Sequence, residues 1–269
     1  TTPPLLRAPA NRVLECPAEI TTNSTGTAIA PDTCGTVTLS YSDVVSNSCA
    51  GTKTLWRTWT ATDGYNSTNH VQTIVVSDTT PPAISVPANT VLEFPGDIST
   101  NLNGVAIALD SCGTVTVTYS DSTTNGCGAT KIVSRLWTAT DECGNTTNAL
   151  QTITIGDTTA PSLVCPNNLA LECPADTTTN ATGIATATDA CGPVAIQYSD
   201  VVSNGTGGTK IIARTWTAID PCGNSTSAVQ TITVSDTAPP KISVGLVTTV
   251  SKSGYDVGNR ALLPGEPSF

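Results

Sequence analysis

The sequence predicts an all-β protein: three tandem immunoglobulin-like β-sandwiches followed by a C-terminal extension strand. Three observations carry this prediction, namely the composition, an internal repeat, and short alternating segments separated by turns. Charged residues make up only 12% of the 269 residues and aromatic residues 4%, and methionine does not occur. The Val and Thr residues that fill the repeats suit a pleated surface better than a helix. Because the chain begins at Thr1 without an initiator methionine, we expect a processed or excised segment.

The repeat is the strongest signal, with a period of about 79 residues. It divides the chain into three modules and a tail, at residues 1–78, 79–157, 158–236 and 237–269. An equivalent tryptophan stands in each module, at Trp59, Trp137 and Trp216. A module of this size has a thin core, and tryptophan is the largest side chain available to fill it. We therefore expect all three tryptophans to be buried.

Each module is expected to consist of strands. The segments Thr152–Ile155 and Thr231–Val234 alternate polar and apolar residues with a period of two, as half-buried strands do. Val115, Val117 and Tyr119 alternate in the same way. Turn sequences such as Cys-Gly-Asn and Ser-Asn-Gly separate these runs. Short strands at regular spacing are typical of a sandwich with Greek-key connections.

The repeated motif resembles a known family. The sequence W-T-A-T-D-x-C-G-N, followed by Q-T-I-T-V-x-D-T-T-P-P, is similar to the hyalin-repeat (HYR-like) modules of secreted and cell-surface proteins, over residues 1–240. The resemblance implies immunoglobulin-like sandwiches in tandem arrays, as on bacterial surface proteins, and a role in extracellular adhesion or architecture. Module 1 departs from the motif, because Gly64-Tyr65-Asn66 replaces the Cys-Gly-Asn turn.

The joints between modules are rich in proline, at Asp78–Pro82, Asp157–Pro161 and Asp236–Pro240. Proline fixes its own φ and biases the preceding residue toward extended backbone. We therefore expect short, semi-rigid joints and a rod-like array.

The tail begins like another module, because Pro239–Val244 matches Pro81–Val86. Its apolar residues predict an assembly strand formed by Ile242, Val244, Leu246, Val247 and Val250. A strand without a domain of its own can satisfy its backbone at the edge of another sheet. We expect it to dock on the first module of another copy, which produces an open head-to-tail fibre. The alternatives are a disordered terminus and a tail folded back on module 3.

Ten cysteines without a C-x-x-C motif favour disulfides in an oxidising, extracellular setting over zinc sites. The spacing repeats between modules 1 and 2 and suggests the pairs Cys34–Cys49 and Cys112–Cys127, with Cys173–Cys222 favoured in module 3. A rival scheme pairs Cys165 with Cys173 and Cys191 with Cys222. The candidates for unpaired or intersubunit cysteines are Cys16, Cys143, Cys165 and Cys191. Cys16 and Cys143 lack their partner within a module, so they could bridge different modules or different subunits.

Six Asn-x-Ser/Thr sequons make glycosylation a possibility, at Asn23, Asn66, Asn145, Asn180, Asn204 and Asn224. Asn66, Asn145 and Asn224 occupy the same turn in the three copies, and exposed turns accept glycans. The alternative is that asparagine is favoured in this turn because it tolerates left-handed backbone.

Charge and missing motifs exclude several functions. The net charge is −10 and there is no basic cluster, which argues against nucleic-acid and anionic-membrane partners. No apolar run is long enough for a membrane-spanning helix. No catalytic motif is present and His70 has no repeat partner, so we expect neither an enzyme nor a cofactor. Oxygen ligands gathered at an inter-module junction could hold calcium, but each junction has scattered single acids instead of a dense D-x-D-x-D loop, so turn-capping roles are expected and calcium is not. The repeated acids concerned are Asp43, Asp121, Asp200; Asp63, Asp141, Asp220; and the joint aspartates Asp78, Asp157, Asp236.

These features together predict a structural subunit of an extracellular or cell-surface fibre. Its main partner would be another copy of itself, with carbohydrate or surface contacts also open. The alternative function is an adhesin fragment or a spacer stalk of a larger cell-surface protein. An adhesin would carry an unrepeated patch, and the unrepeated candidates are Trp56, Tyr65 and His70.

Overall fold

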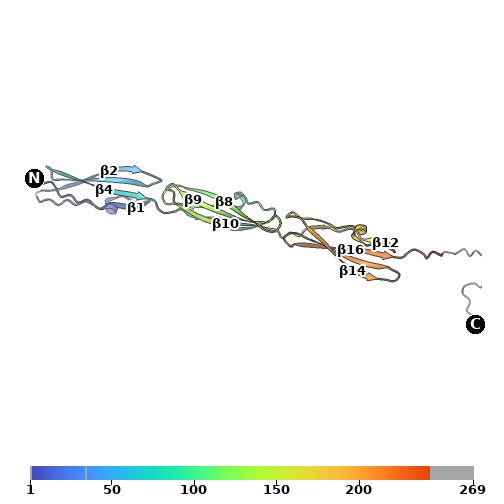
Figure 1. Ribbon diagram of the computed structural model, residues 1–269. Helices are drawn as coiled ribbons and strands as arrows, with labels where there is room; N and C mark the ends of the chain where they lie inside the picture. Colours follow the sequence, from blue (N-terminus) through green and yellow to red (C-terminus); the bar gives the residue numbers. More distant parts are fainter. Residues whose placement is uncertain (1, 34, 243–269) are drawn as a thin grey trace, which may run out of the picture.

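The computed structural model describes residues 2–33 and 35–242, and shows three β-sandwich modules in a row (Figure 1). The modules follow one another in chain order along an elongated rod, with the N-terminus at one end. The predicted all-β fold class is confirmed. Cys34 and most of the predicted assembly strand, from residue 243 onward, lie outside the described residues.

Modules 2 and 3 are built from the same seven elements, and module 1 has five of them, because the three sequences repeat one pattern. Module 1 contains β1 (Arg12–Glu15), α1 (Thr22–Thr25), β2 (Thr38–Asn47), β3 (Lys53–Thr62) and β4 (Ser67–Ser77). Module 2 contains β5 (Ala83–Ser85), β6 (Thr90–Glu93), α2 (Thr100–Asn103), β7 (Ile107–Leu109), β8 (Val115–Asn125), β9 (Lys131–Asp141) and β10 (Thr146–Gly156). Module 3 contains β11 (Ser162–Val164), β12 (Leu169–Glu172), α3 (Thr179–Thr182), β13 (Thr186–Thr188), β14 (Ala195–Asn204), β15 (Lys210–Ile219) and β16 (Ser225–Ser235).

The main sheet of each module has four strands. In module 1 the order is β1-β4-β3-β2, with β1 parallel to β4 and the other pairs antiparallel. The second layer carries a small two-stranded sheet, β5–β7 in module 2 and β11–β13 in module 3. In module 1 a single bridge between Arg7 and Ile29 takes its place. The predicted strands around Val117, Thr152 and Thr231 are confirmed as parts of β8, β10 and β16.

The repeated tryptophan lies in the core of each module, as predicted, with Trp59, Trp137 and Trp216 each 2% exposed. The Trp59 indole N–H donates to the Gln72 side-chain oxygen at 3.2 Å. The Gln72 amide group in turn donates to the carbonyl oxygens of Ala10 and Thr25, at 2.9 and 2.8 Å. This buried glutamine therefore ties the main sheet to the second layer, and its hydrogen bonds compensate for its burial. Gln151 and Gln230 repeat the arrangement.

A buried ion pair crosses the same sheet. Asp43 on β2 lies opposite Arg57 on β3, and its two carboxylate oxygens accept hydrogen bonds from Arg57 at 2.8 and 2.9 Å. The Arg57 guanidinium also lies 4.3 Å from the centre of the Tyr41 ring. The pair recurs as Arg135–Asp121 and Arg214–Asp200. The predicted turn-capping role is therefore wrong for Asp43, Asp121 and Asp200, because cross-strand register places each carboxylate beside a buried guanidinium.

The second set of repeated acids does cap turns. The Asp63 carboxylate accepts hydrogen bonds from the backbone N–H groups of Tyr65 and Asn66, at 2.8 and 2.7 Å. Asp141 and Asp220 accept equivalent bonds in modules 2 and 3. In modules 2 and 3 this turn meets the preceding module, because the Asn145 and Asn224 amide groups donate to the Asp78 and Asp157 carbonyl oxygens.

Candidate functional site at the module junctions

The repeated polar side chains that do not serve a module core gather where modules meet. Junction 1 is the contact between modules 1 and 2 around the joint Asp78–Pro82, and junction 2 is the contact between modules 2 and 3 around Asp157–Pro161. Glutamates, cysteines, asparagines and aspartates from both sides converge at each junction. We treat these junctions as the candidate functional site, because their arrangement determines how the modules are held relative to one another.

A glutamate at the end of the first strand of the main sheet holds each joint. Because β1 runs parallel to β4, its last residue, Glu15, lies beside the segment that follows β4. The Glu15 carboxylate accepts hydrogen bonds from the backbone N–H groups of Thr79 and Thr80, at 2.7 and 3.1 Å. It also accepts bonds from both threonine hydroxyls, at 3.0 and 2.8 Å. These bonds, the Thr79 N–H foremost, lower the pKa of Glu15.

The same clamp recurs in the other two modules. Glu93 accepts four hydrogen bonds from Thr158 and Thr159, and Glu172 accepts three from Thr237 and Ala238. Sequence analysis did not identify these glutamates as functional residues. The signal was present, since an L-E-x-P segment in every copy accompanies the D-T-[TA]-x-P joint.

Three disulfides cross the junctions. Cys16–Cys112 and Cys49–Cys143 both connect modules 1 and 2, and Cys127–Cys222 connects modules 2 and 3. Cys165, Cys173 and Cys191 are free thiols. The expectation of disulfides and of unpaired Cys165 and Cys191 is therefore confirmed. The free state of Cys173 contradicts the prediction. Cys16 and Cys143 follow the alternative that they bridge different modules, because each is bonded to a cysteine of the neighbouring module.

The predicted pairings within modules are wrong for a geometric reason. Cys112 precedes the 11-residue strand β8 and Cys127 follows it, so the strand separates them by roughly 36 Å. A disulfide requires Cα atoms roughly 4.4–6.8 Å apart. The predicted pair Cys34–Cys49 is contradicted because Cys49 is bonded to Cys143. In module 3, Cys222 precedes strand β16, whereas Cys173 lies near the other end of that strand. The rival scheme fails as well, because Cys222 is bonded to Cys127. Each observed bond instead joins a cysteine of one module to a cysteine of the next module, across a junction.

Two predicted glycosylation sites are part of this contact. The Asn145 amide group donates to the Asp141 carboxylate at 2.8 Å and to the Asp78 carbonyl oxygen at 3.2 Å. Asn224 bonds Asp220 and the Asp157 carbonyl in the same manner. The expectation that this repeated turn is freely exposed is thus wrong for Asn145 and Asn224, whose amide nitrogens are already used. Asn66 is half-buried, whereas Asn23, Asn180 and Asn204 are exposed.

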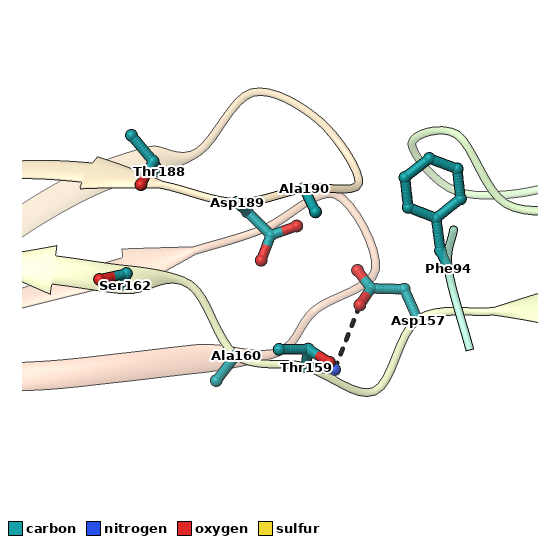
Figure 2. Close-up of a pocket in the computed structure, with 8 residues that line it drawn as sticks. All are labelled: Phe94, Asp157, Thr159, Ala160, Ser162, Thr188, Asp189 and Ala190. Atoms are coloured by element: carbon teal, nitrogen blue, oxygen red, sulfur yellow. Dashed lines mark hydrogen bonds between the residues drawn. The ribbon is translucent and has the colours of Figure 1, made fainter. Parts of the chain in front are cut away.

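Each junction also collects three carboxylates, one from the joint and two from the module that follows it. At junction 1 these are Asp78, Asp110 and Asp141, and at junction 2 they are Asp157, Asp189 and Asp220. In each group, one oxygen from every carboxylate lies within 4.8 Å of the others. Figure 2 shows the Asp157 and Asp189 carboxylates facing each other beside a hollow of about 450 Å³ that is also lined by Phe94 and Ala160.

Comparisons with known proteins identify no family. No protein-family model matches the chain, and no curated protein matches it. Among solved structures, the extracellular domain of protocadherin GammaB4 aligns at 14% identity with a TM-score of 0.29, over 86% of this chain and 49% of that one. Drosophila N-cadherin EC1-4 aligns at 13% identity with a TM-score of 0.30, over 87% and 76%. The chain therefore spans about half the length of the first of these proteins. Within residues 2–33 and 35–242, no helix combines the length and apolar character needed to cross a membrane.

Proposed function

We propose that this chain is a structural subunit of an extracellular fibre in which the tail of one copy joins module 1 of the next. Its function is then mechanical, and its principal partner is a second copy of itself. The junctions support a mechanical role, because clamps and disulfides at both of them hold neighbouring modules in a fixed arrangement. An adhesin fragment or a spacer stalk of a larger surface protein is the alternative.

The observation that carries the proposal is the third joint. Glu172 clamps Thr237 and Ala238 through bonds of 2.7–3.0 Å, as Glu15 and Glu93 clamp the joints that lead into modules 2 and 3. The clamp thus holds the start of the tail, and residues 237–242 lead away from module 3 at the end of the rod (Figure 1). The tail then begins with the first-strand sequence of a module.

The end of module 3 resembles one half of a junction. A hollow of about 470 Å³ lies there, lined in part by Lys210, Val234 and Asp236. The equivalent hollow at junction 1 has a volume of about 260 Å³ and is lined partly by Cys143 of module 2. We infer that module 1 of the next copy occupies the end of module 3 in the same way.

The distribution of cysteines supports this end-to-end arrangement, in which module 1 of the next copy meets the end of module 3. Cys173 is free and lies beside Gly208, as the bonded Cys16 lies beside Gly51. At the sequence position equivalent to Cys112, module 1 has Cys34. The second bridge would lack both of its cysteines, because Thr206 replaces the equivalent of Cys49 and the shortened turn at Tyr65 replaces that of Cys143. In this arrangement Cys173 would pair with Cys34 of the next copy, and no cysteines would be available for a second bridge.

Exposed strand edges provide a surface that can accept added backbone. β2 and β14 are the outer strands of their sheets, and nearly all of their residues are exposed. Val44 and Val201 are 63% and 68% exposed on these strands, whereas the equivalent residue in module 2 is Ser122. Open edges with apolar residues favour strand addition. Only the two terminal modules combine these features in the part of the chain that the structure describes.

Negative-stain microscopy tests the proposal. We expect the full chain to form filaments and a variant ending at Pro240 to remain as short rods. Substituting Ile242→Asp and Val244→Asp together should have the same effect without shortening the tail, and a Ser251→Ala variant is the control that should still polymerise. Filaments that persist without the tail, or a full chain that stays monomeric across a concentration series, would overturn strand donation.

Non-reducing electrophoresis tests this end-to-end arrangement. In the presence of oxidised glutathione, the thiols of Cys173 and Cys34 of two copies would lose two protons and two electrons, and glutathione would be reduced to its thiol form. We expect a ladder of covalent oligomers that disappears in Cys173→Ser and persists in the control Cys165→Ser. A ladder that is unchanged in Cys173→Ser would refute this arrangement.

A further inference from the structure

The carboxylate triads at the junctions have no cationic partner in the described residues. The three ion pairs found there join Arg57, Arg135 and Arg214 to acids on neighbouring strands, and none involves a junction aspartate. Three of the six junction acids are buried, with Asp78 8%, Asp141 6% and Asp220 5% exposed. Like charges held this close in a partly desolvated site repel each other unless a cation or protons compensate them.

One oxygen at each junction is both buried and unpartnered. Asp78 Oδ1 accepts a hydrogen bond from the Thr80 N–H at 3.3 Å, whereas Asp78 Oδ2 is buried and has no partner within the described part of the chain. At junction 2, Asp157 Oδ2 is also buried without a hydrogen-bond partner among the described residues, and Asp157 Oδ1 accepts from the Thr159 N–H (Figure 2). Asp157 as a whole is half-buried, and the Cys191 thiol lies beside its carboxylate. A buried carboxylate oxygen is normally satisfied, so this recurrence indicates a ligand that completes the site.

Burial and the neighbouring carboxylates of Asp110 and Asp141 raise the pKa of Asp78, although the Thr80 N–H opposes this. The direction of this shift agrees with the geometry, since it reports a negative charge that its surroundings do not compensate.

We propose that each junction binds one divalent cation, Ca²⁺, through Asp78, Asp110 and Asp141 at junction 1 and through Asp157, Asp189 and Asp220 at junction 2. Calcium takes six to eight oxygen ligands at about 2.3–2.6 Å, so oxygens on opposite sides of the ion lie roughly 4.6–5.2 Å apart. The separation of at most 4.8 Å within each triad fits around one such ion. Water entering from the hollow shown in Figure 2 supplies the remaining ligands.

Zinc fits these residues less well. Cys191 and Cys222 also lie near Asp157, but the Cys222 sulfur is bonded to Cys127. The equivalent group at junction 1 contains no cysteine, because its members are Asp78, Asp110 and Asp141. What remains at both junctions is a set of carboxylate oxygens, the ligands that calcium prefers.

The cation would connect two modules, because Asp78 belongs to one module and Asp110 and Asp141 belong to the next. Asp141 would then have two roles, because it caps its own turn, as predicted, and also presents a carboxylate oxygen to the triad. In a head-to-tail fibre the same set would form from Asp236 of one copy and the Asp32 and Asp63 of the next. That third site rests on the proposed function, whereas the two internal sites do not.

Isothermal titration calorimetry of the chelator-treated full chain with CaCl₂ tests the internal sites. We expect two ions per chain and higher melting temperatures in millimolar calcium. The double variant Asp78→Asn/Asp157→Asn should lose both effects. The control Asp97→Asn/Asp176→Asn removes the same charge from acids that bond within their own loops and should keep both effects.

Variants that fail to fold would be recognised by the loss of the near-ultraviolet circular dichroism of the core tryptophans. In that case Asp110→Asn/Asp189→Asn, whose acids lie in half-buried loops, replaces the first double variant. Absence of uptake at millimolar calcium, or equal uptake by the site and control variants, would overturn the proposal. The variant ending at Pro240 is titrated in parallel with the full chain. It keeps both internal sites, so we expect it to bind two calcium ions even if it does not polymerise.

Discussion

The buried ion pair in each module leads to a quantitative prediction for Asp121→Ala. Arg135 is 1% exposed and its guanidinium is held by both oxygens of Asp121, at 2.8 Å each. Removing one partner of a buried pair leaves an uncompensated charge, which costs about 3–5 kcal/mol. The Asp121 side chain is 24% exposed, so water can partly replace it. We therefore expect a loss at the lower end, about 3 kcal/mol in the stability of module 2.

Hydrogen exchange of the β9 amides measures this loss in module 2 separately. A loss of about 3 kcal/mol corresponds to exchange that is faster by about 10²-fold. The equivalent strands β3 and β15 keep their own pairs and serve as internal controls in the same molecule. The double variant Asp121→Ala/Arg135→Met should recover most of the loss, because it leaves no buried charge. Unchanged exchange in Asp121→Ala, or a double variant as unstable as the single one, would refute this account.

The pair also determines how module 2 responds to acid. The hydrogen bonds from Arg135 lower the pKa of Asp121 below its ordinary value of 3.8. The unfolded chain therefore binds a proton at a higher pH than the folded chain does. The stabilisation is fully present above the unfolded pKa and is lost as the pH falls through the folded pKa. The exchange difference between wild type and Asp121→Ala should shrink over that acidic range.

Three further outcomes follow from the junctions and the cores. Glu93→Gln should loosen junction 2 and broaden the distance distribution measured by X-ray scattering, whereas the same change at Glu19, which clamps no joint, should not. Hydrogen bonds lower the pKa of Glu93. The clamp should therefore persist below the ordinary pKa of 4.5 and weaken only as the pH falls through the lowered pKa of the folded state. Reduction of the disulfides should broaden that distance distribution and leave the near-ultraviolet circular dichroism of the tryptophans intact. If reduction also abolished the tryptophan signal, the folding of each module would depend on the bridges. Trp216→Phe should destabilise module 3 by about 1–3 kcal/mol, because it leaves the buried Gln230 oxygen without a donor; the comparison is Trp56→Phe, at a residue that is 39% exposed, and equal exchange rates in the two variants would contradict this reasoning.

The fold could be predicted from the sequence because its signals are local. The alternation around Val117 and Thr231 fixes which residues face the core, and the repeat shows that the pattern is used three times. Burial of Trp59 and its equivalents follows from size alone. These inferences do not require knowledge of which strands are neighbours.

The junctions could not be predicted to the same extent, because they depend on which end of a module each residue occupies. Cys112 and Cys127 are close in sequence and about one strand length apart in space. The bond between Cys16 and Cys112 spans a sequence separation of 96 residues, and no local pattern reports it. Glu15 was missed because its role requires the parallel pairing of β1 with β4, which places it beside Thr79.

The cross-module disulfides have a consequence for a molecule pulled from its two ends. A continuous covalent route runs from the N-terminus to Cys16, across to Cys112, along β8 to Cys127, across to Cys222, and along β16 toward the C-terminus. Tension therefore bypasses residues 17–111 and 128–221, and the backbone that bears the load in modules 2 and 3 consists largely of strands that are already extended. Even if its hydrogen bonds break, such a chain gains little end-to-end length, so the disulfide-bonded molecule should be nearly inextensible under tension.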